Sequence, residues 1–110
     1  METETHTLTR DGAPDVRFRG AKLAAVSSFN HRNNNTRWTE INIYQTSLRG
    51  QYLVQVVGRT QWVNESNRFA VHVCKDENAV IEALTVDGYL SDLAKEALDD
   101  AGIECVEIVK

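Results

Sequence analysis

Two stretches of alternating apolar and polar residues, joined by a short turn, form the clearest pattern in the chain. The first, RWTEINIYQT, spans residues 37–46, and the second, YLVQVVGR, spans residues 52–59. Alternation with a period of two is typical of half-buried strands, because successive side chains point to opposite faces of a sheet. Gly50 in the turn readily adopts the positive φ that a tight reversal needs. The pattern therefore predicts a β-hairpin at the centre of the fold.

The hairpin assigns each of its side chains to one of two faces. The face expected to form the core carries Ile41, Ile43, Tyr52, Val54 and Val56. The other face carries Trp38, Asn42, Tyr44, Leu53, Gln55 and Val57. In the expected register Glu40 lies opposite Arg59, a pair that would contribute ~0.2–1 kcal/mol and help to fix the alignment.

The residues before the hairpin predict a tail and two further strands. Residues 1–15 are mostly polar and end in turn-forming residues, so we expect a flexible N-terminal tail ahead of a single domain over residues 16–110. Residues 16–19 alternate as a short strand, which Gly20 ends or bulges. Residues 21–29 are interpreted as another strand, although their first part is also compatible with a helical turn.

The residues after the hairpin predict a strand, two helices and a last strand. Residues 68–74 alternate as a strand, and Asp76 is the expected cap of a first helix. The second helix is expected over residues 89–100, ending at Gly102. One apolar stripe at helical spacing runs along it, formed by Leu90, Leu93, Ala94, Ala97 and Leu98. Residues 105–109 have the composition of a strand.

This order of elements indicates an α+β fold. We expect an antiparallel β-sheet of five to six strands with the two C-terminal helices packed on one face. The predicted core comprises Ile41, Ile43, Val54, Val56, Phe69, Val71, Leu93 and Leu98.

Length and charge bound the kind of protein. A chain of 110 residues is long enough for one core without a metal or a disulfide. The net charge of −4 divides unevenly, because residues 1–75 carry ten Lys and Arg against six Asp and Glu, whereas residues 76–110 carry two against ten. The acidic helical surface either only solvates the fold or binds a partner. Its candidate binding residues are Glu82, Asp92, Glu96 and Asp99.

The chain lacks the patterns that mark catalytic, metal and phosphate sites. His72, Cys74 and Cys105 do not have zinc-ligand spacing, and Ser27 and Ser28 lie in no nucleophile motif. No glycine-rich phosphate loop is present. We therefore expect no catalytic residue, no metal and no cofactor, and an enzyme of unknown type remains only as an alternative. Two cysteines without an apolar leader favour a cytoplasmic protein, and no apolar run is long enough for a membrane span.

The second face of the hairpin is a candidate binding surface. Trp38 and Tyr44 lie there beside Arg37, Arg59 and Gln55, an arrangement that resembles a stacking platform for single-stranded nucleic acid. The same face could instead be covered by the N-terminal residues or by the strand over residues 16–19, or it could contact a protein.

Several short motifs resemble the EXLDI family of small bacterial proteins. They are Phe18-Arg19-Gly20 with Leu23-Ala24, Arg37-Trp38-Thr39-Glu40, Ile43-Tyr44-Gln45-Thr46, Gly50-Gln51-Tyr52-Leu53-Val54, and Glu104-Cys105-Val106-Glu107-Ile108. In the last motif Val106 and Glu107 stand where the family name has Leu and Asp. The helical N-terminal segment of some members is absent, which weakens a DNA-binding inference. The resemblance implies a small cytoplasmic protein of bacteria or mobile elements, with no assigned activity.

Together these observations predict a non-enzymatic binding module, monomeric or homodimeric, that engages a protein partner. A phage- or plasmid-encoded accessory or inhibitor protein fits this description. Single-stranded nucleic-acid binding on the basic and aromatic sheet face is the alternative.

Overall fold

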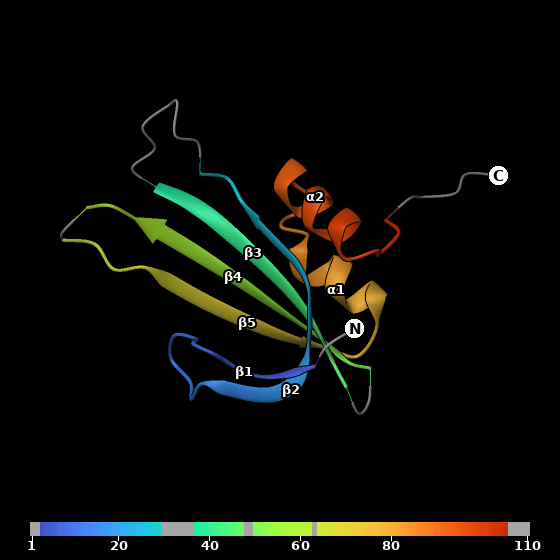
Figure 1. Ribbon diagram of the computed structural model, residues 1–110. Coiled ribbons are helices and arrows are strands. Elements are labelled where there is room, and N and C mark those ends of the chain that lie inside the picture. The colour runs from blue at the N-terminus through green and yellow to red at the C-terminus, as the bar shows by residue number, and fades with distance from the viewer. Residues whose placement is uncertain (1–2, 30–36, 48–49, 63, 106–110) are drawn as a thin grey trace.

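The computed structural model describes residues 3–29, 37–47, 50–62 and 64–105. It contains a curled antiparallel sheet with the strand order β1-β2-β3-β4-β5, followed by two helices that cover one face (Figure 1). The elements are β1 (Glu4–Leu8), β2 (Val16–Ser27), β3 (Arg37–Thr46), β4 (Tyr52–Thr60), β5 (Arg68–Cys74), α1 (Glu77–Leu84) and α2 (Asp92–Asp100). The predicted α+β fold, with its antiparallel sheet and two C-terminal helices on one face, is therefore confirmed.

The central hairpin has the predicted faces but a different register. Ile41 lies opposite Val56, as expected for residues on one face. Glu40 lies opposite Val57 and not opposite Arg59, so the predicted alignment was wrong by two residues. A shift of two residues keeps every side chain on its face, which is why the face assignment survives. The Arg59 and Glu40 side chains still meet diagonally at 3.2 Å.

Both helices begin at side-chain caps. Asp76 accepts a hydrogen bond from the Ala79 amide at 2.8 Å, as predicted for the start of α1. The second helix begins at Asp92, three residues later than the predicted start at residue 89, with Ser91 as its cap. The delay arises because residues 86–89 form a tight turn through Asp87 and Gly88, both with positive φ.

The main core lies between the helices and the sheet. Its buried members come from four of the strands, both helices and the segment after α2: Ala24, Val26, Ile41, Ile43, Val54, Cys74, Val80, Leu84, Ala94, Ala97, Leu98 and Ile103. Val56 and Leu93 are partly buried and pack against this cluster. These contacts place six of the eight predicted core residues in or against the main core.

The other two predicted core residues lie on the opposite face of the sheet. Phe69 pairs with Val57, and Val71 pairs with Gln55, so both point away from the helices. The register of β5 on β4 depends on the length of the connecting turn, which the alternation within β5 alone does not define. Their placement in the main core was therefore wrong.

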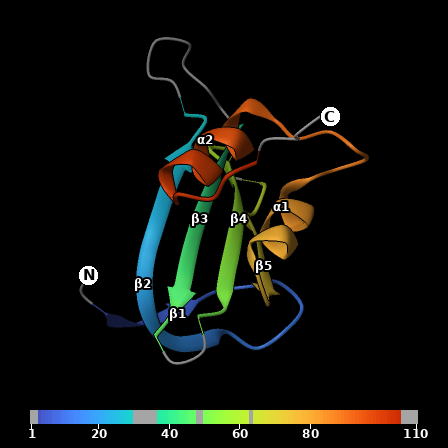
Figure 2. The same ribbon diagram turned by 90° about the vertical axis from the view of Figure 1, so that its right-hand side faces the viewer.

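The N-terminal residues are part of the sheet. Residues 4–8 form β1, which pairs with β2 in the register Leu8 opposite Val16, where the sequence predicts a flexible tail. Figure 2 shows β1 passing behind the sheet, on the side away from the helices. A second apolar cluster fills the space between, formed by Leu8, Tyr44 and Leu53 with Val16, Phe18 and Val71 around them. The hairpin of β1 and β2 thus covers the face that the helices leave open.

Strand β2 is one continuous strand of 12 residues, where the sequence predicts two. Its irregularity lies between Lys22 and Ala24 and not at Gly20. Gly20 is instead paired on both sides, with Glu4 and with Thr46. The pairing of β2 with β1 ends at this glycine, and the described pairing of β2 with β3 begins there.

A contact after β1 connects the two ends of the sheet. The Asp11 amide donates to the Phe69 carbonyl at 2.9 Å, and the Phe69 amide donates to Asp11 Oδ2 at 3.0 Å. Phe69 belongs to β5, so the chain that leaves β1 reaches the last strand. The curled sheet is therefore held at both of its edges.

The C-terminal strand predicted over residues 105–109 falls almost entirely outside the described residues, and Cys105 itself is not in a strand. Neither helix in the described part of the chain has the length and apolarity to cross a membrane.

Candidate functional site

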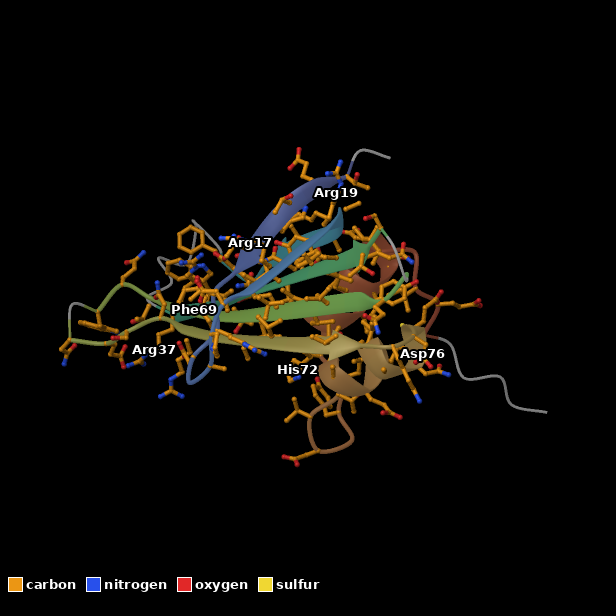
Figure 3. All side chains as sticks on the ribbon, turned by 90° about the horizontal axis from the view of Figure 1, so that it is seen from below. Arg17, Arg19, Arg37, Phe69, His72 and Asp76 are labelled. Atoms are coloured by element: carbon orange, nitrogen blue, oxygen red, sulfur yellow. The ribbon has the colours of Figure 1, made fainter. Side chains whose placement is uncertain are left out.

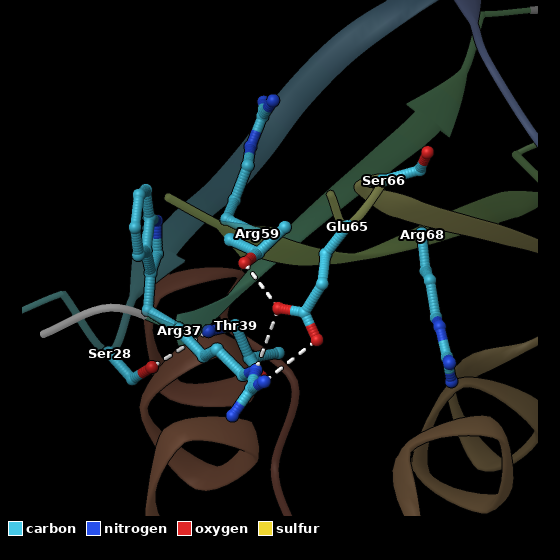
Figure 4. Close-up of a pocket in the computed structure, with 10 residues that line it drawn as sticks. Ser28, Arg37, Thr39, Arg59, Glu65, Ser66 and Arg68 are labelled. Carbon is cyan, nitrogen blue, oxygen red and sulfur yellow. Dashed lines mark hydrogen bonds and ion pairs between the residues drawn. The ribbon is translucent and has the colours of Figure 1, made fainter. Parts of the chain in front are cut away.

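A pocket of about 660 Å³ lies at the end of β3, β4 and β5 that extends past the helices (Figure 4). It is lined by Ser28, Arg37, Trp38, Thr39, Gly58, Arg59, Thr60, Glu65, Ser66 and Arg68. Three of the predicted partner-binding residues, Arg37, Trp38 and Arg59, are among these. We call it the arginine pocket.

Strand alternation explains how the arginine pocket is formed. Thr39 lies opposite Gly58 on β4, and Gly58 lies opposite Arg68 on β5. Because Gly58 has no side chain, the space between Thr39 and Arg68 stays open. Figure 4 shows Arg37 and Arg68 projecting to one side of the sheet and Arg59 to the other.

Glu65 already occupies part of the arginine pocket. Its carboxylate accepts from Arg37 Nε at 3.0 Å and from Arg37 Nη2 at 2.7 Å. The Thr60 hydroxyl donates to the same carboxylate at 2.8 Å. These hydrogen bonds, with the positive charges of Arg37 and Arg68, lower the pKa of Glu65. In turn, the hydrogen bond and the negative charge of Glu65 raise the pKa of Arg37. The arginine pocket is thus built to hold an ionised carboxylate.

The lowered pKa predicts that Glu65 contributes to stability only while it is ionised. The contribution is present above the usual pKa of 4.5 and is lost as the pH falls through the lower, folded-state value. We expect Glu65→Gln to destabilise the protein at neutral pH and to match wild type increasingly well in acid. Urea unfolding across a pH series measures the difference in unfolding free energy between wild type and Glu65→Gln. When Arg37→Gln is present in both chains, this difference should depend less on pH. A difference that stays constant with pH would contradict this prediction.

Glu40 holds the other two predicted residues of the arginine pocket. It accepts from Arg59 Nε at 3.2 Å and from Trp38 Nε1 at 3.1 Å. The Arg59 guanidinium also lies 5.7 Å from the centre of the Phe69 ring. The Trp38 ring meets Phe29 edge-on at 4.7 Å between centroids. Trp38 and Arg59 are therefore fixed at the edge of the arginine pocket.

Arg68 differs from Arg37 and Arg59 in having no ion pair within the described residues. Among the residues that the structure describes, no carboxylate pairs with it, and its side chain is exposed. Arg59 is balanced by Glu40, while Arg37 and Arg68 share Glu65. One positive charge therefore remains in the arginine pocket.

Tyr44 and Gln55, the other two residues of the predicted platform, lie elsewhere. They are only 4% and 8% exposed. Tyr44 contacts the rings of His6 and Phe18, and its burial raises the pKa of its hydroxyl. Gln55 Nε2 donates to the Thr9 carbonyl at 3.1 Å. The N-terminal residues thus cover this part of the hairpin face, which is one of the alternatives stated in the sequence analysis.

The acidic candidate residues are separate from the arginine pocket. Glu82 lies on α1, and Asp92, Glu96 and Asp99 lie on α2; all four are exposed, and none lines the arginine pocket. The structure therefore does not bring the two predicted groups of partner-binding residues into one site.

Sequence reasoning missed Glu65, Thr60 and Arg68. Glu65 lies in a segment interpreted only as a turn, and Arg68 opens a strand whose register was not known. The pairing of β3 with β4 places Thr60 opposite Arg37, and the pairing of β4 with β5 brings Glu65 and Arg68 to the same pocket. The pattern within each segment contains no signal for that contact.

The described part of the chain contains no cluster of three or more His, Cys, Asp or Glu residues that could hold a metal ion. Comparisons with protein-family models, with curated proteins and with solved structures found no match for this chain. The resemblance to the EXLDI family therefore stays a prediction.

Proposed function

We propose that this protein is a non-enzymatic binding module that engages an acidic segment of a partner protein through the arginine pocket. The observation that supports it is the Glu65 carboxylate held by Arg37, with the unpaired Arg68 lining the same space. A phage- or plasmid-encoded accessory or inhibitor role belongs to the same proposal, and it rests on the absence of catalytic motifs and on the EXLDI resemblance.

A carboxylate is the ligand that suits this chemistry. Planar guanidinium groups donate parallel hydrogen bonds to carboxylates, and such charge-assisted bonds are roughly twice as strong as neutral ones. The hydroxyls of Ser66 and Thr39 in the lining are further potential donors. Since one positive charge remains in the arginine pocket, a single carboxylate of the partner would balance it.

Nucleic-acid binding is the second candidate and has less support. Stacking needs an open aromatic face, but Tyr44 is buried and Trp38 is half-buried against Phe29.

Binding of two labelled probes tests the proposal. Fluorescence anisotropy at low salt would follow a peptide of six glutamates and a single-stranded oligothymidine. We expect the peptide to bind and Arg68→Gln to raise its Kd roughly 10-fold or more, because a hydrogen bond to a charged group contributes about 1.5–3 kcal/mol. The matched control is Arg19→Gln, which removes an exposed arginine of β2 outside the arginine pocket and should leave the Kd unchanged.

Two results would overturn the proposal. Equal weakening by both variants would mean that the attraction is only the general charge of the surface. Binding of the oligothymidine without the peptide would replace the acidic partner by nucleic acid.

A further inference from the structure

We infer that the outer edge of β5 is a second binding site, which accepts an extended segment of a partner protein as an added strand. The inference rests on the proposal that the partner is a protein, but it does not depend on the arginine pocket. Main-chain hydrogen bonds would supply affinity, and side-chain contacts at alternate positions would supply specificity.

The backbone of β5 offers unused donors and acceptors. Both the amide and the carbonyl of Phe69 bond to Asp11, so they point away from β4. Because the direction of backbone groups alternates along a strand, those of Val71 and Val73 point outward as well. Within the described residues, no hydrogen bond uses either group of these two valines. They form a short free edge.

The side chains do not protect this edge. Val73 is 59% exposed, and residues 71–73 include no proline, no charged residue and no irregularity in the pairing with β4. Natural edge strands usually carry such protection. The edge of β2 after Gly20, which β1 does not cover, carries such protection, because an irregularity follows Lys22 and α2 packs against the strand.

Other exposed apolar residues lie on the same side of the molecule. Val86 and Tyr89, in the turn between α1 and α2, are 67% and 69% exposed. Figures 2 and 3 show this connection projecting beyond the edge of β5. Exposed apolar groups gathered on one side mark protein contact sites. With Val73, these residues account for three of the four large apolar side chains that are exposed in the described part of the chain.

The surroundings limit the size and the chemistry of the added strand. Asp11 blocks the edge at Phe69, and the strand ends at Cys74 before α1 begins. This leaves room for a segment of about five residues at ~3.4 Å per residue. Lys75 follows the Cys74 end of the free edge and favours an acidic residue there, whereas Arg68 lies beyond the block at Phe69. The expected occupant is an extended segment of β-branched residues with an acid at the end beside Lys75.

A synthetic peptide, acetyl-Glu-Val-Thr-Val-Glu-amide, serves as the probe for the full chain labelled with nitrogen-15. We expect its addition to shift the amide signals of Val71 and Val73 most strongly. Exchange of these two amide protons with solvent should slow at least 10-fold at saturation, because both would become hydrogen-bonded.

Val73→Pro removes an amide that no described residue uses, and edge strands tolerate proline where the amide faces solvent. This variant should weaken peptide binding at least 10-fold. Val73→Thr, which keeps the amide and the β-branch, should bind like wild type. Arg37→Gln alters the arginine pocket alone and should leave binding at the β5 edge intact, so failure at one site is distinguishable from failure at the other.

The inference is overturned if Val73→Pro binds the peptide as wild type does, or if the largest shifts fall outside β5. It is also overturned if the wild-type chain shows no slowing of exchange at Val71 and Val73. The exchange measurement uses the unmodified chain and decides the matter even if the proline variant does not fold.

Discussion

Replacing Leu98 by alanine should lower the free energy of unfolding by about 2–5 kcal/mol. Leu98 is 0% exposed and belongs to the cluster between α2 and the sheet. Its truncation removes buried methyl groups and leaves a cavity that the rigid sheet cannot fill. Urea unfolding followed by circular dichroism measures the loss.

Leu93→Ala is the matched control on the same helix. Leu93 is only partly buried, so its truncation should cost clearly less than that of Leu98. The apolar stripe in the sequence contains both leucines and does not rank them. Equal losses would mean that α2 is rotated relative to the sheet from the orientation described above.

Gly20→Ala should destabilise the protein by at least ~3 kcal/mol, the upper end of the usual range for overpacked sites. A methyl group there would lie against the Gln45 carbonyl oxygen, 2.9 Å from its carbon and 3.0 Å from Thr46 Cα. These are backbone atoms of β3, and they cannot move without disrupting the pairing of β2 with β3. Urea unfolding again provides the measurement.

Gly58→Ala is the control for this change, since its added methyl group would approach only the Arg68 Cβ, at 3.6 Å, an ordinary contact. We expect it to leave stability nearly unchanged. If Gly20→Ala were equally mild, Gly20 could not lie as close to the backbone of Gln45 and Thr46 as described above.

Local patterns were enough to predict those parts of the fold that local physics defines. Asp76 caps α1 because its side chain reaches an amide three residues ahead, which the sequence displays directly. The faces of β3 and β4 follow from the alternation of side chains along each strand, and an error of two residues in the register leaves every side chain on its face. The stripe of α2 likewise identifies the face that is buried.

Other features depend on contacts between distant segments. Strand β1 has a polar sequence with Leu8 as its buried anchor, and it forms because β2 and the second cluster are there to receive it. The burial of Tyr44 follows from that pairing, so the predicted platform could not be distinguished from a covered face. The contact of Arg37 with Glu65 likewise exists only after β4 and β5 have paired, because it joins residues 28 positions apart.

The contact between Asp11 and Phe69 also affects the order in which parts of the sheet can form during translation. The two residues are 58 positions apart, so at the usual rates of translation roughly 3–12 s pass between their synthesis. During this interval β1 and β2 can pair, but β5 is missing and the curled sheet cannot close. Leu53 and its neighbours in the second cluster then lack their contact with Val71. The segment after β1 is synthesised first but gains its contact with β5 last. The nascent chain therefore keeps an open apolar face until β5 leaves the ribosome.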